Sequence, residues 1–197
     1  RLAMDSVRRN KEGVSPVRPL LDEMEEAKTL SDLRALQLKY AVFGYGVPFD
    51  YGFDADEKNA KMNILNISQG GLTLGQKEYY LDNDRATSDI RNAYRKFIVN
   101  MFCLYGFSDG QALARRNAVM RYETMLALLS KSRTELRDVE ANYNKMTLDE
   151  FKAKYPAIPL EQLANAEGIK SEYIQSMVVG QPAFLAGVDK LASTEAE

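Results

Sequence analysis

The sequence predicts a mainly α-helical fold, a helical bundle-like domain with a small inserted β-hairpin or sheet around residues 47–68. Two observations support this prediction. Apolar residues recur at helical spacing in several segments that begin with capping signals and end at glycine. Between these segments the pattern changes to alternation, because Phe49, Tyr51 and Phe53 are separated by polar or small residues. With 45% hydrophobic and 27% charged residues, the composition is that of a globular domain.

The N-terminal part of the chain is expected to be helical. Ser15-Pro16 and Arg18-Pro19 each offer a helix start with proline in the first turn. Ser31 is expected to cap the next helix, which Gly44 and Gly46 are expected to end. The apolar face of that helix is expected to hold Leu33, Leu36, Tyr40 and Phe43.

The expected hairpin turns at residues 54–59 and is followed directly by Gln69-Gly70-Gly71-Leu72. Adjacent glycines after a strand indicate a positive φ or a close approach of another segment. Tyr79-Tyr80-Leu81 then supplies large apolar groups with polar tips, which suit packing of the turn against a core. We therefore interpret residues 69–81 as a tight junction between the strand and the helical layer.

Two long helices are expected next. The first follows Thr87-Ser88 and ends at Gly106, and a capping box of Ser108 and Gln111 opens the second. The apolar stripe of the first helix is formed by Ile90, Tyr94, Phe97, Ile98, Met101, Phe102 and Tyr105. The buried face of the second is expected to hold Val119, Tyr122, Leu126 and Leu129.

The C-terminal third contains two further helix starts. Thr147 and Glu150 have capping-box spacing, with Met146 and Phe151 placed as a hydrophobic staple. Gln181-Pro182 begins a last helix, and residues 192–197 are expected to fray. The apolar face of that helix comprises Phe184, Leu185, Val188 and Leu191. No repeat or linker divides the chain, so residues 1–197 are expected to form a single unit.

The chain contains no histidine, which excludes Ser-His-Asp and Cys-His nucleophiles, histidine zinc ligands and histidine bases. Cys103 is the one cysteine and lies among apolar residues, so we expect a buried, inert thiol with a raised pKa. A pair of carboxylates that performs acid–base chemistry is neither predicted nor excluded. Such a pair is recognised by the distance between its two carboxyl groups, which the sequence does not give. No catalytic or metal-binding residue is therefore assigned, and substrate-binding residues are unknown.

Composition also restricts the partners. A net charge of −2 gives no positive electrostatic field that would attract the phosphates of nucleic acid, so nucleic acid is not an expected partner. The longest apolar run, residues 125–129, is far shorter than the ~20 residues that span a bilayer, and no signal peptide is visible. The chain begins with Arg1 instead of methionine, so it is expected to be processed or part of a longer protein.

Three weaker patterns have ordinary explanations. Asp54 and Asp56 begin a calcium-loop pattern that fails at three later positions, so a solvated hairpin turn is expected. Gly44-x-Gly46 begins a possible phosphate-binding motif, but such a motif opens a helix, whereas these glycines are expected to end one. The pairs Arg8-Arg9 and Arg115-Arg116 are interpreted as solvated helix faces.

The segment from Gln69 to Leu81 resembles the Gln-Gly-Gly-Leu-Gly-Leu-Pro…Tyr-Tyr-Leu segment of the neprilysin/endothelin-converting-enzyme zinc endopeptidases. Thr73 and Gly75 depart from that pattern, and Leu160 stands where the family often has tryptophan. Further ordered similarities cover nearly the whole chain: Met4-Asp5-Ser6, Gly13, Pro19-Leu20, Lys28-Thr29, Asp32-Leu33, residues 53–59, Asn63-Ile64, Arg137-Asp138, Tyr143-Asn144-Lys145-Met146-Thr147, Val178-Val179, Gln181-Pro182 and Phe184-Leu185.

The resemblance implies a zinc peptidase, similar to bacterial oligoendopeptidase O, that cleaves small peptides. Its His-Glu-x-x-His zinc helix has no counterpart here, so the chain is expected to begin after the family's first segment and to stop before its catalytic domain. Asn92-Ala93-Tyr94 resembles the family's substrate-binding motif but stands at a different place in the chain. We interpret that match as coincidence and Tyr94 as a core residue.

Two functions follow as hypotheses. By resemblance, the chain is most of the non-catalytic helical lid that restricts access to zinc in the downstream catalytic domain. Alternatively, it is a free-standing helical module that binds a peptide or protein. A carboxylate-only enzyme has no supporting motif. The lid hypothesis implies an exposed apolar patch where the catalytic domain would pack, and family analogy alone suggests the cell envelope, periplasm or exterior.

Overall fold

The computed structural model describes residues 5–44 and 47–193, and the fold is mainly helical, as predicted. The 3₁₀ segments are η2 (Ala41–Phe43), η3 (Glu135–Arg137) and η4 (Ser171–Ile174). The α-helices are α1 (Ser6–Glu12), α2 (Arg18–Glu26), α3 (Leu30–Tyr40), α4 (Glu78–Leu81), α5 (Arg85–Tyr105), α6 (Asp109–Leu129), α7 (Val139–Asn142), α8 (Leu148–Lys154), α9 (Leu160–Ala166) and α10 (Pro182–Ser193).

The inserted β-region is one part of a larger sheet. The predicted hairpin forms from β1 (Phe49–Asp56) and β2 (Asn59–Gln69). Within the described residues, β3 (Asn144–Thr147) and β4 (Ser176–Val179) complete a mixed sheet with the order β1-β2-β4-β3. β4 runs parallel to β2, with Ile67 opposite Val179. The sheet thus joins segments more than 100 residues apart.

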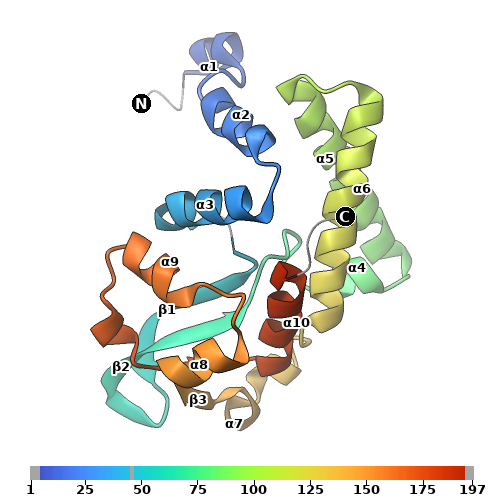
Figure 1. Cartoon of the computed structure of the whole chain (residues 1–197). Coiled ribbons are helices and arrows are strands. Elements are labelled where there is room, and N and C mark those ends of the chain that lie inside the picture. The colour runs from blue at the N-terminus through green and yellow to red at the C-terminus, as the bar shows by residue number, and fades with distance from the viewer. Residues whose placement is uncertain (1–4, 45–46, 194–197) are drawn as a thin grey trace.

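The elements form two bodies and an N-terminal arm, as Figure 1 shows. The sheet, α8, α9 and α10 make one body, and α4, α5 and α6 make the other, with α10 beside α6. We call α1, α2 and α3 the N-terminal arm. α3 lies across the top of the sheet body in the view of Figure 1, and α1 and α2 rise beside the tip of the α5–α6 hairpin.

The main hydrophobic core lies between the sheet and its covering helices. Phe151, Tyr155 and Phe184 are completely inaccessible to solvent, and Leu65 and Met177 contribute from the sheet. A second, smaller cluster joins α4, α5 and α6. By contrast, no described residue of α1, α2 or α3 is buried.

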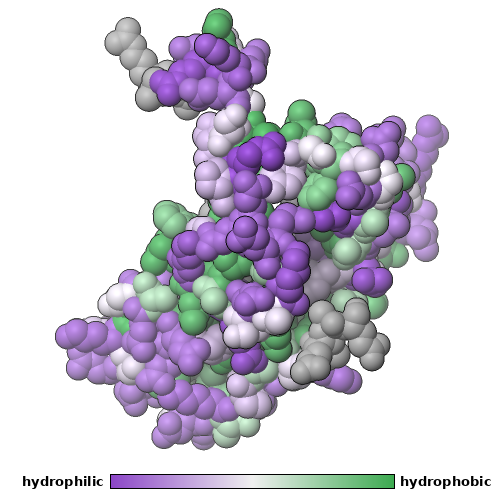
Figure 2. All heavy atoms as spheres, turned by 45° about the horizontal axis from the view of Figure 1, so that its top comes forward, coloured by the Kyte–Doolittle hydropathy of each residue, from purple (hydrophilic) through white to green (hydrophobic). Residues whose placement is uncertain are grey.

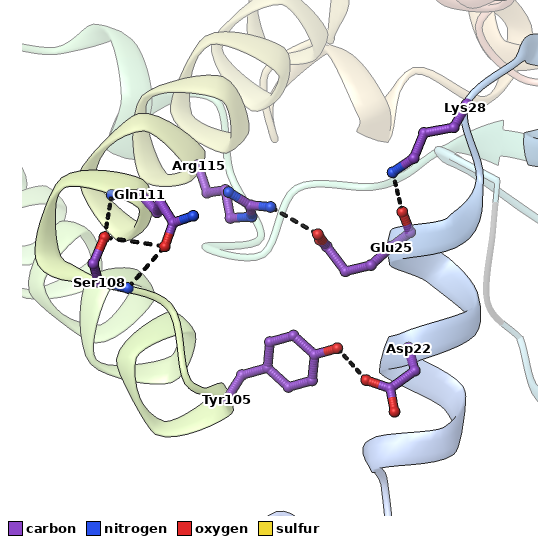
Figure 3. Close-up of polar contacts among 7 residues, drawn as sticks. All are labelled: Asp22, Glu25, Lys28, Tyr105, Ser108, Gln111 and Arg115. Carbon is purple, nitrogen blue, oxygen red and sulfur yellow. Dashed lines mark hydrogen bonds and ion pairs between the residues drawn. The ribbon is translucent and has the colours of Figure 1, made fainter.

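Polar contacts attach α2 to the α5–α6 tip (Figure 3). The Tyr105 hydroxyl donates to the Asp22 carboxylate, and Arg115 pairs with Glu25 at 2.7 Å. Arg18 donates to the Tyr105 carbonyl at 2.9 Å. These residues are exposed or only partly buried, so the attachment depends on solvent-accessible charges.

Local capping decides where the helices begin, and two N-terminal predictions were wrong. Ser15-Pro16 lies in the turn after α1 and does not start a helix. Thr29, not Ser31, caps α3, because Asp32 completes a capping box with it. Gly44 ends η2 at φ 72°, whereas Gly46 lies outside the described residues.

The remaining helix signals fall close to their predicted places. Capping boxes open α6 at Ser108 and α8 at Thr147, and α10 begins at Pro182. Asp84 caps α5 three residues before the predicted start. Two residues of the apolar faces predicted for the long helices are exposed instead of buried. Phe97 of α5 is 55% exposed and Tyr122 of α6 is 42% exposed. Most of the tail predicted to fray, residues 194–197, lies outside the described residues.

Candidate functional site

Gly70 and Gly71 stand where β2 leaves the sheet, and the neighbouring Asp50 and Pro48 crowd the space that their side chains would need. A Cβ on Gly71 would lie 2.9 Å from the Cα of Pro48, and the φ of Gly71 is +74°. A Cβ on Gly70 would lie 2.8 Å from the Asp50 carboxylate. Gly71 therefore combines a left-handed conformation with close backbone approach, which glycine tolerates best.

The Gln69 side chain fastens this junction to the end of α6. Its amide donates to the Lys131 carbonyl at 3.0 Å and accepts from the Lys131 N–H at 2.7 Å. The Gln69 N–H donates to the Gln181 side chain at 2.8 Å. Gln181 and Lys131 both donate to the Asn142 side chain, each at 3.0 Å. This network joins β2, α6, α7 and the start of α10.

The Glu123 carboxylate organises the second half of the motif. It accepts hydrogen bonds from the hydroxyls of Thr73 at 2.6 Å, Tyr80 at 2.8 Å and Tyr94 at 3.0 Å. The Tyr80 hydroxyl also accepts the Leu74 N–H at 3.0 Å. Glu123 is only 6% exposed. Tyr94 is a core residue, as predicted, but sequence analysis missed its buried partner Glu123.

The chemistry available at this cluster is limited. Burial, with the Glu123 carboxylate adding to it, raises the pKa of Tyr94 to about 12, and burial likewise raises the pKa of Tyr80. Both phenols therefore stay neutral at physiological pH and donate to the carboxylate. The cluster thus joins α4, α5 and α6 through hydrogen bonds to one buried carboxylate.

The remaining motif residues lie around the junction. Leu72 packs between the two hydrophobic clusters, and Tyr79 and Leu81 pack against the smaller one. Arg91, which is buried, donates to the carbonyls of Tyr79, Tyr80 and Asp82 and so satisfies the end of α4. Sequence analysis missed this role of Arg91.

The later motif lies at the edge of the sheet. Arg137 is exposed in η3, and Asp138 caps α7 by accepting the Ala141 N–H at 3.0 Å. The Asn144 side chain donates to the Val179 carbonyl at 3.0 Å. The Tyr143 hydroxyl donates to the Asp56 carboxylate at 2.8 Å.

Asp56 corrects one prediction, since the hairpin turn is not simply solvated. Asp56 is 3% exposed and pairs with Lys145 at 2.9 Å. Hydrogen bonds from Lys145, the Lys58 N–H and Tyr143 lower the pKa of Asp56 to about 2. The pair connects the β1–β2 hairpin to β3.

Cys103 differs slightly from the prediction of a buried thiol. It is half-buried and lies 3.6 Å from the Asp109 carboxylate. Partial burial and this carboxylate raise the pKa of Cys103, as predicted. A raised pKa lowers the thiolate fraction and therefore the reactivity of the thiol.

A groove of about 680 Å³ separates the N-terminal arm from the two bodies. Met24 and Leu33 line the arm side, and Tyr122, Ile158 and Val188 belong to the opposite side. Figure 2 shows apolar surface next to the hydrophilic N-terminal helices. Polar and apolar groups therefore meet in one concave surface.

A second apolar surface is one exposed face of α5. Ile90, Phe97, Met101 and Leu104 are between 41% and 64% exposed and recur at helical spacing. Tyr94 and Ile98 of the same predicted stripe are buried on the flank next to these exposed residues. We call the four exposed residues the α5 stripe. Such a row of large apolar side chains suits a protein contact.

The whole chain matches one protein family. The model of peptidase family M13, N-terminal part, covers residues 1–197. The chain belongs to peptidase family M13. It is 30% identical over 149 residues to endothelin-converting enzyme 1 of Cavia porcellus, covering 74% of this chain and 20% of that protein. It is 31% identical over 126 residues to an endothelin-converting enzyme homolog of Locusta migratoria, covering 64% of this chain and 17% of that one.

Solved structures of two bacterial proteins share the fold of this chain. Zinc metalloprotease Zmp1 of Mycobacterium tuberculosis superposes with a TM-score of 0.86 at 23% identity, covering 96% of this chain and 29% of that one. PepO from Lactobacillus rhamnosis superposes with a TM-score of 0.74 at 23% identity, covering 95% and 29%. The chain thus spans under a third of the length of these relatives.

The residues of this M13 chain do not fit a zinc site. Zinc in proteins is held by histidine, cysteine, aspartate and glutamate. The chain has no histidine and one cysteine, and the described residues contain no group of three such side chains that could hold a metal. No helix in the described part is long and apolar enough to cross a bilayer.

Proposed function

We propose that this chain is the lid portion of an M13 zinc metalloendopeptidase that cleaves small peptides. One observation carries the proposal. A chain that matches the N-terminal model of a peptidase family from end to end has no histidine with which to build a His-Glu-x-x-His zinc helix. The catalytic zinc of the parent protein would then be bound by residues outside this sequence, and the chain alone would hydrolyse nothing.

The lid would act by enclosing the substrate. Covering a metal site excludes bulk water and limits entry to peptides small enough to pass. In this proposal residues 1–197 form one unit, and its partner is the downstream catalytic domain of the parent. The Gln69–Leu81 motif holds the sheet body and the helical body together, since the hydrogen bonds between Gln69 and Lys131 cross from one to the other. The Asn144 contact with Val179 lies within the sheet.

The α5 stripe is the surface that we assign to the catalytic domain. Its four apolar residues are exposed here, and relatives have more than two thirds of their length outside the matched region. Burying a large apolar side chain stabilises an interface by roughly 1.5–3 kcal/mol. Burial of the stripe would therefore contribute favourably to a contact with the catalytic domain.

The first test is a peptidase assay of the purified chain with a quenched fluorescent peptide, with and without added zinc. We expect no hydrolysis above the buffer rate. Zinc-dependent cleavage that a chelator abolishes would contradict the proposal. A stop codon directly after residue 197 would favour the alternative, a free-standing peptide- or protein-binding module.

The second test uses the longer protein that contains this chain. Replacing Phe97→Asp should weaken the domain contact and raise cleavage of unfolded casein relative to a short peptide, because the lid opens. Leu128→Asp is the matched control, since Leu128 is also exposed, at 66% against 55% for Phe97, but lies on α6 outside the α5 stripe. An unchanged ratio in the Phe97 variant would count against the lid assignment.

A further inference from the structure

The body formed by α4, α5 and α6 carries a depression on its surface, where these three helices meet (Figure 1). Tyr80 of α4, Arg91 and Arg95 of α5 and Arg121 of α6 line it. Its volume of about 630 Å³ lies within the range of 300–1,000 Å³ that is typical of small-molecule sites. The depression belongs to one body, so its shape does not depend on the N-terminal arm.

The charge of the depression has one sign. Arg91, Arg95 and Arg121 line it, and none of the described residues around it is acidic. Arg91 and Arg95 stand one helical turn apart, so their like charges repel each other. Within the described part of the chain, no ion pair involves any of the three arginines. An anion in the depression would therefore remove a repulsion that the chain itself does not compensate.

Arg91 supplies a fixed positive charge. It is only 8% exposed, and its two terminal nitrogens donate to the carbonyls of Tyr79, Tyr80 and Asp82. These carbonyls are neutral, so they hold the guanidinium in place without cancelling its charge. The buried Glu123 carboxylate accepts from nearby hydroxyls, including that of Tyr80 at 2.8 Å, but is not part of the lining. Arg91 thus attracts an anion without needing to contact it directly.

Arg95 and Arg121 provide the donors that can contact a ligand. Both side chains are exposed. Arg95 uses one bond to the Asn92 side chain, at 3.1 Å, and Arg121 makes no hydrogen bond or ion pair within the described residues. A guanidinium carries five N–H donors in a planar fork that matches the oxygens of a phosphate. Most of the donors of these two arginines are therefore available to a phosphate group.

Apolar side chains complete the depression. Met120 and Met125 of α6 line it together with Tyr80. Methionine is flexible and polarisable, so it adapts to ligands of different shapes. The space is larger than an inorganic phosphate ion would fill. The lining therefore suits an organic group attached to the phosphate.

We propose that this depression binds a small organic phosphate, a phosphate monoester, with the phosphate held by Arg95 and Arg121 beside the fixed charge of Arg91. The site needs no metal and no residue outside the chain. Arg91 and Arg95 stand roughly 100° and 140° around α5 from Ile90 of the α5 stripe. The site and the proposed contact with the catalytic domain thus use different sides of α5, and either proposal can fail without the other.

The test is a nuclear magnetic resonance titration of the isotope-labelled 197-residue chain at about pH 8 and constant ionic strength. Phenyl phosphate and benzoate share a ring, but at this pH the phosphate is a dianion and the carboxylate a monoanion. We expect phenyl phosphate to bind about tenfold more tightly and to shift the amides around Arg91 and Thr124. No saturable shift up to about 10 mM phenyl phosphate, or equal affinity for the two probes, would overturn the proposal.

Inorganic phosphate tests the organic part of the assignment. It carries the charge but has no group to contact Met125, so we expect it to bind about fivefold more weakly than phenyl phosphate. Equal affinity for the two would contradict a site for phosphate monoesters and indicate one for free phosphate.

Two variants and one control locate the site. Arg95→Ala and Arg121→Ala should each weaken phenyl phosphate at least about fivefold. Lys96→Ala removes an exposed cation beside Arg95 on the same helix but outside the depression, and should leave the affinity nearly unchanged. All three residues are exposed, so the variants should fold, which circular dichroism checks. An equal loss in all three variants would show general attraction of anions instead of a site.

Discussion

The N-terminal arm and the sheet body use opposite means of stabilisation. No described residue of α1, α2 or α3 is buried, and the arm is attached through Asp22, Glu25 and their partners. In the sheet body Phe151, Tyr155 and Phe184 are fully buried. The body therefore has its own core, whereas α2 is attached through solvent-exposed polar contacts and α3 packs on that core through the partly buried Leu38. This difference teaches that burial distinguishes the part of the fold with its own core from the part that is attached at its surface.

The largest expected effect tests the core of the sheet body. Phe184→Ala should lower the free energy of unfolding by about 3–5 kcal/mol, because it leaves a cavity at a fully buried position. Leu33→Ala in the arm should cost less than about 1 kcal/mol, since Leu33 is half exposed. Urea denaturation measures both. Equal losses would remove the distinction between the two regions.

The next effect concerns the junction between the two bodies. Gly71→Ala should destabilise the chain by about 2–4 kcal/mol, because alanine is strained at a φ of +74° and its Cβ would meet the Pro48 backbone. Gly75→Ala is the matched control, with a φ of +78° in open space, and should cost only about 1–2 kcal/mol. Thermal unfolding of both variants separates crowding from strain. A smaller loss for Gly71 than for Gly75 would contradict the close approach.

A smaller effect tests the Asp56–Lys145 pair through its pH dependence. The folded-state pKa of Asp56 is lowered to about 2 from an ordinary value of 3.8. The pair therefore contributes its full stability above about pH 4 and loses that contribution as the pH falls toward 2. The difference in unfolding free energy between the wild type and Asp56→Asn should shrink over this window.

The control for the pH experiment is Asp54→Asn, which changes an exposed carboxylate on the same hairpin. It should show little difference from the wild type across the same pH range. A wild-type advantage over Asp56→Asn that stays constant or grows as the pH falls would show that Asp56 is not the titrating group.

The smallest expected effect tests the attachment of the arm. Arg115→Ala removes a partly exposed ion pair with Glu25 and should cost less than about 1 kcal/mol of global stability. It should nevertheless speed hydrogen exchange in α2, and high salt should reproduce part of that change in the wild type. Arg116→Ala, on the same helix but paired with Asn117, is the control. No change in α2 exchange would show that other contacts hold the arm.

The predictable features of the fold were those encoded within a few residues. Ser108 with Gln111, and Thr147 with Glu150, mark helix starts because each capping box closes within three residues. The β1–β2 hairpin shows alternation over its own length. Thr29 was missed because Ser31 is an equally good capping residue, and only the Asp32 contact distinguishes them.

The features that escaped prediction depend on distant partners. β4 pairs with β2 more than 100 residues away, and β3 has only four residues, too few for a clear alternation. Glu123 meets Thr73, Tyr80 and Tyr94 across separations of 29 to 50 residues. In sequence it resembles any glutamate on a helix. Its position among the core residues Met120, Leu126 and Ala127 was the one available signal.

Native-state hydrogen exchange measured residue by residue tests the contrast between arm and body most directly. Amides of β4 and α10 should exchange only through global unfolding, whereas amides of α2 and α3 should exchange through local opening with a much smaller free energy. Equal protection of α2 and β4 in the free chain would contradict the account.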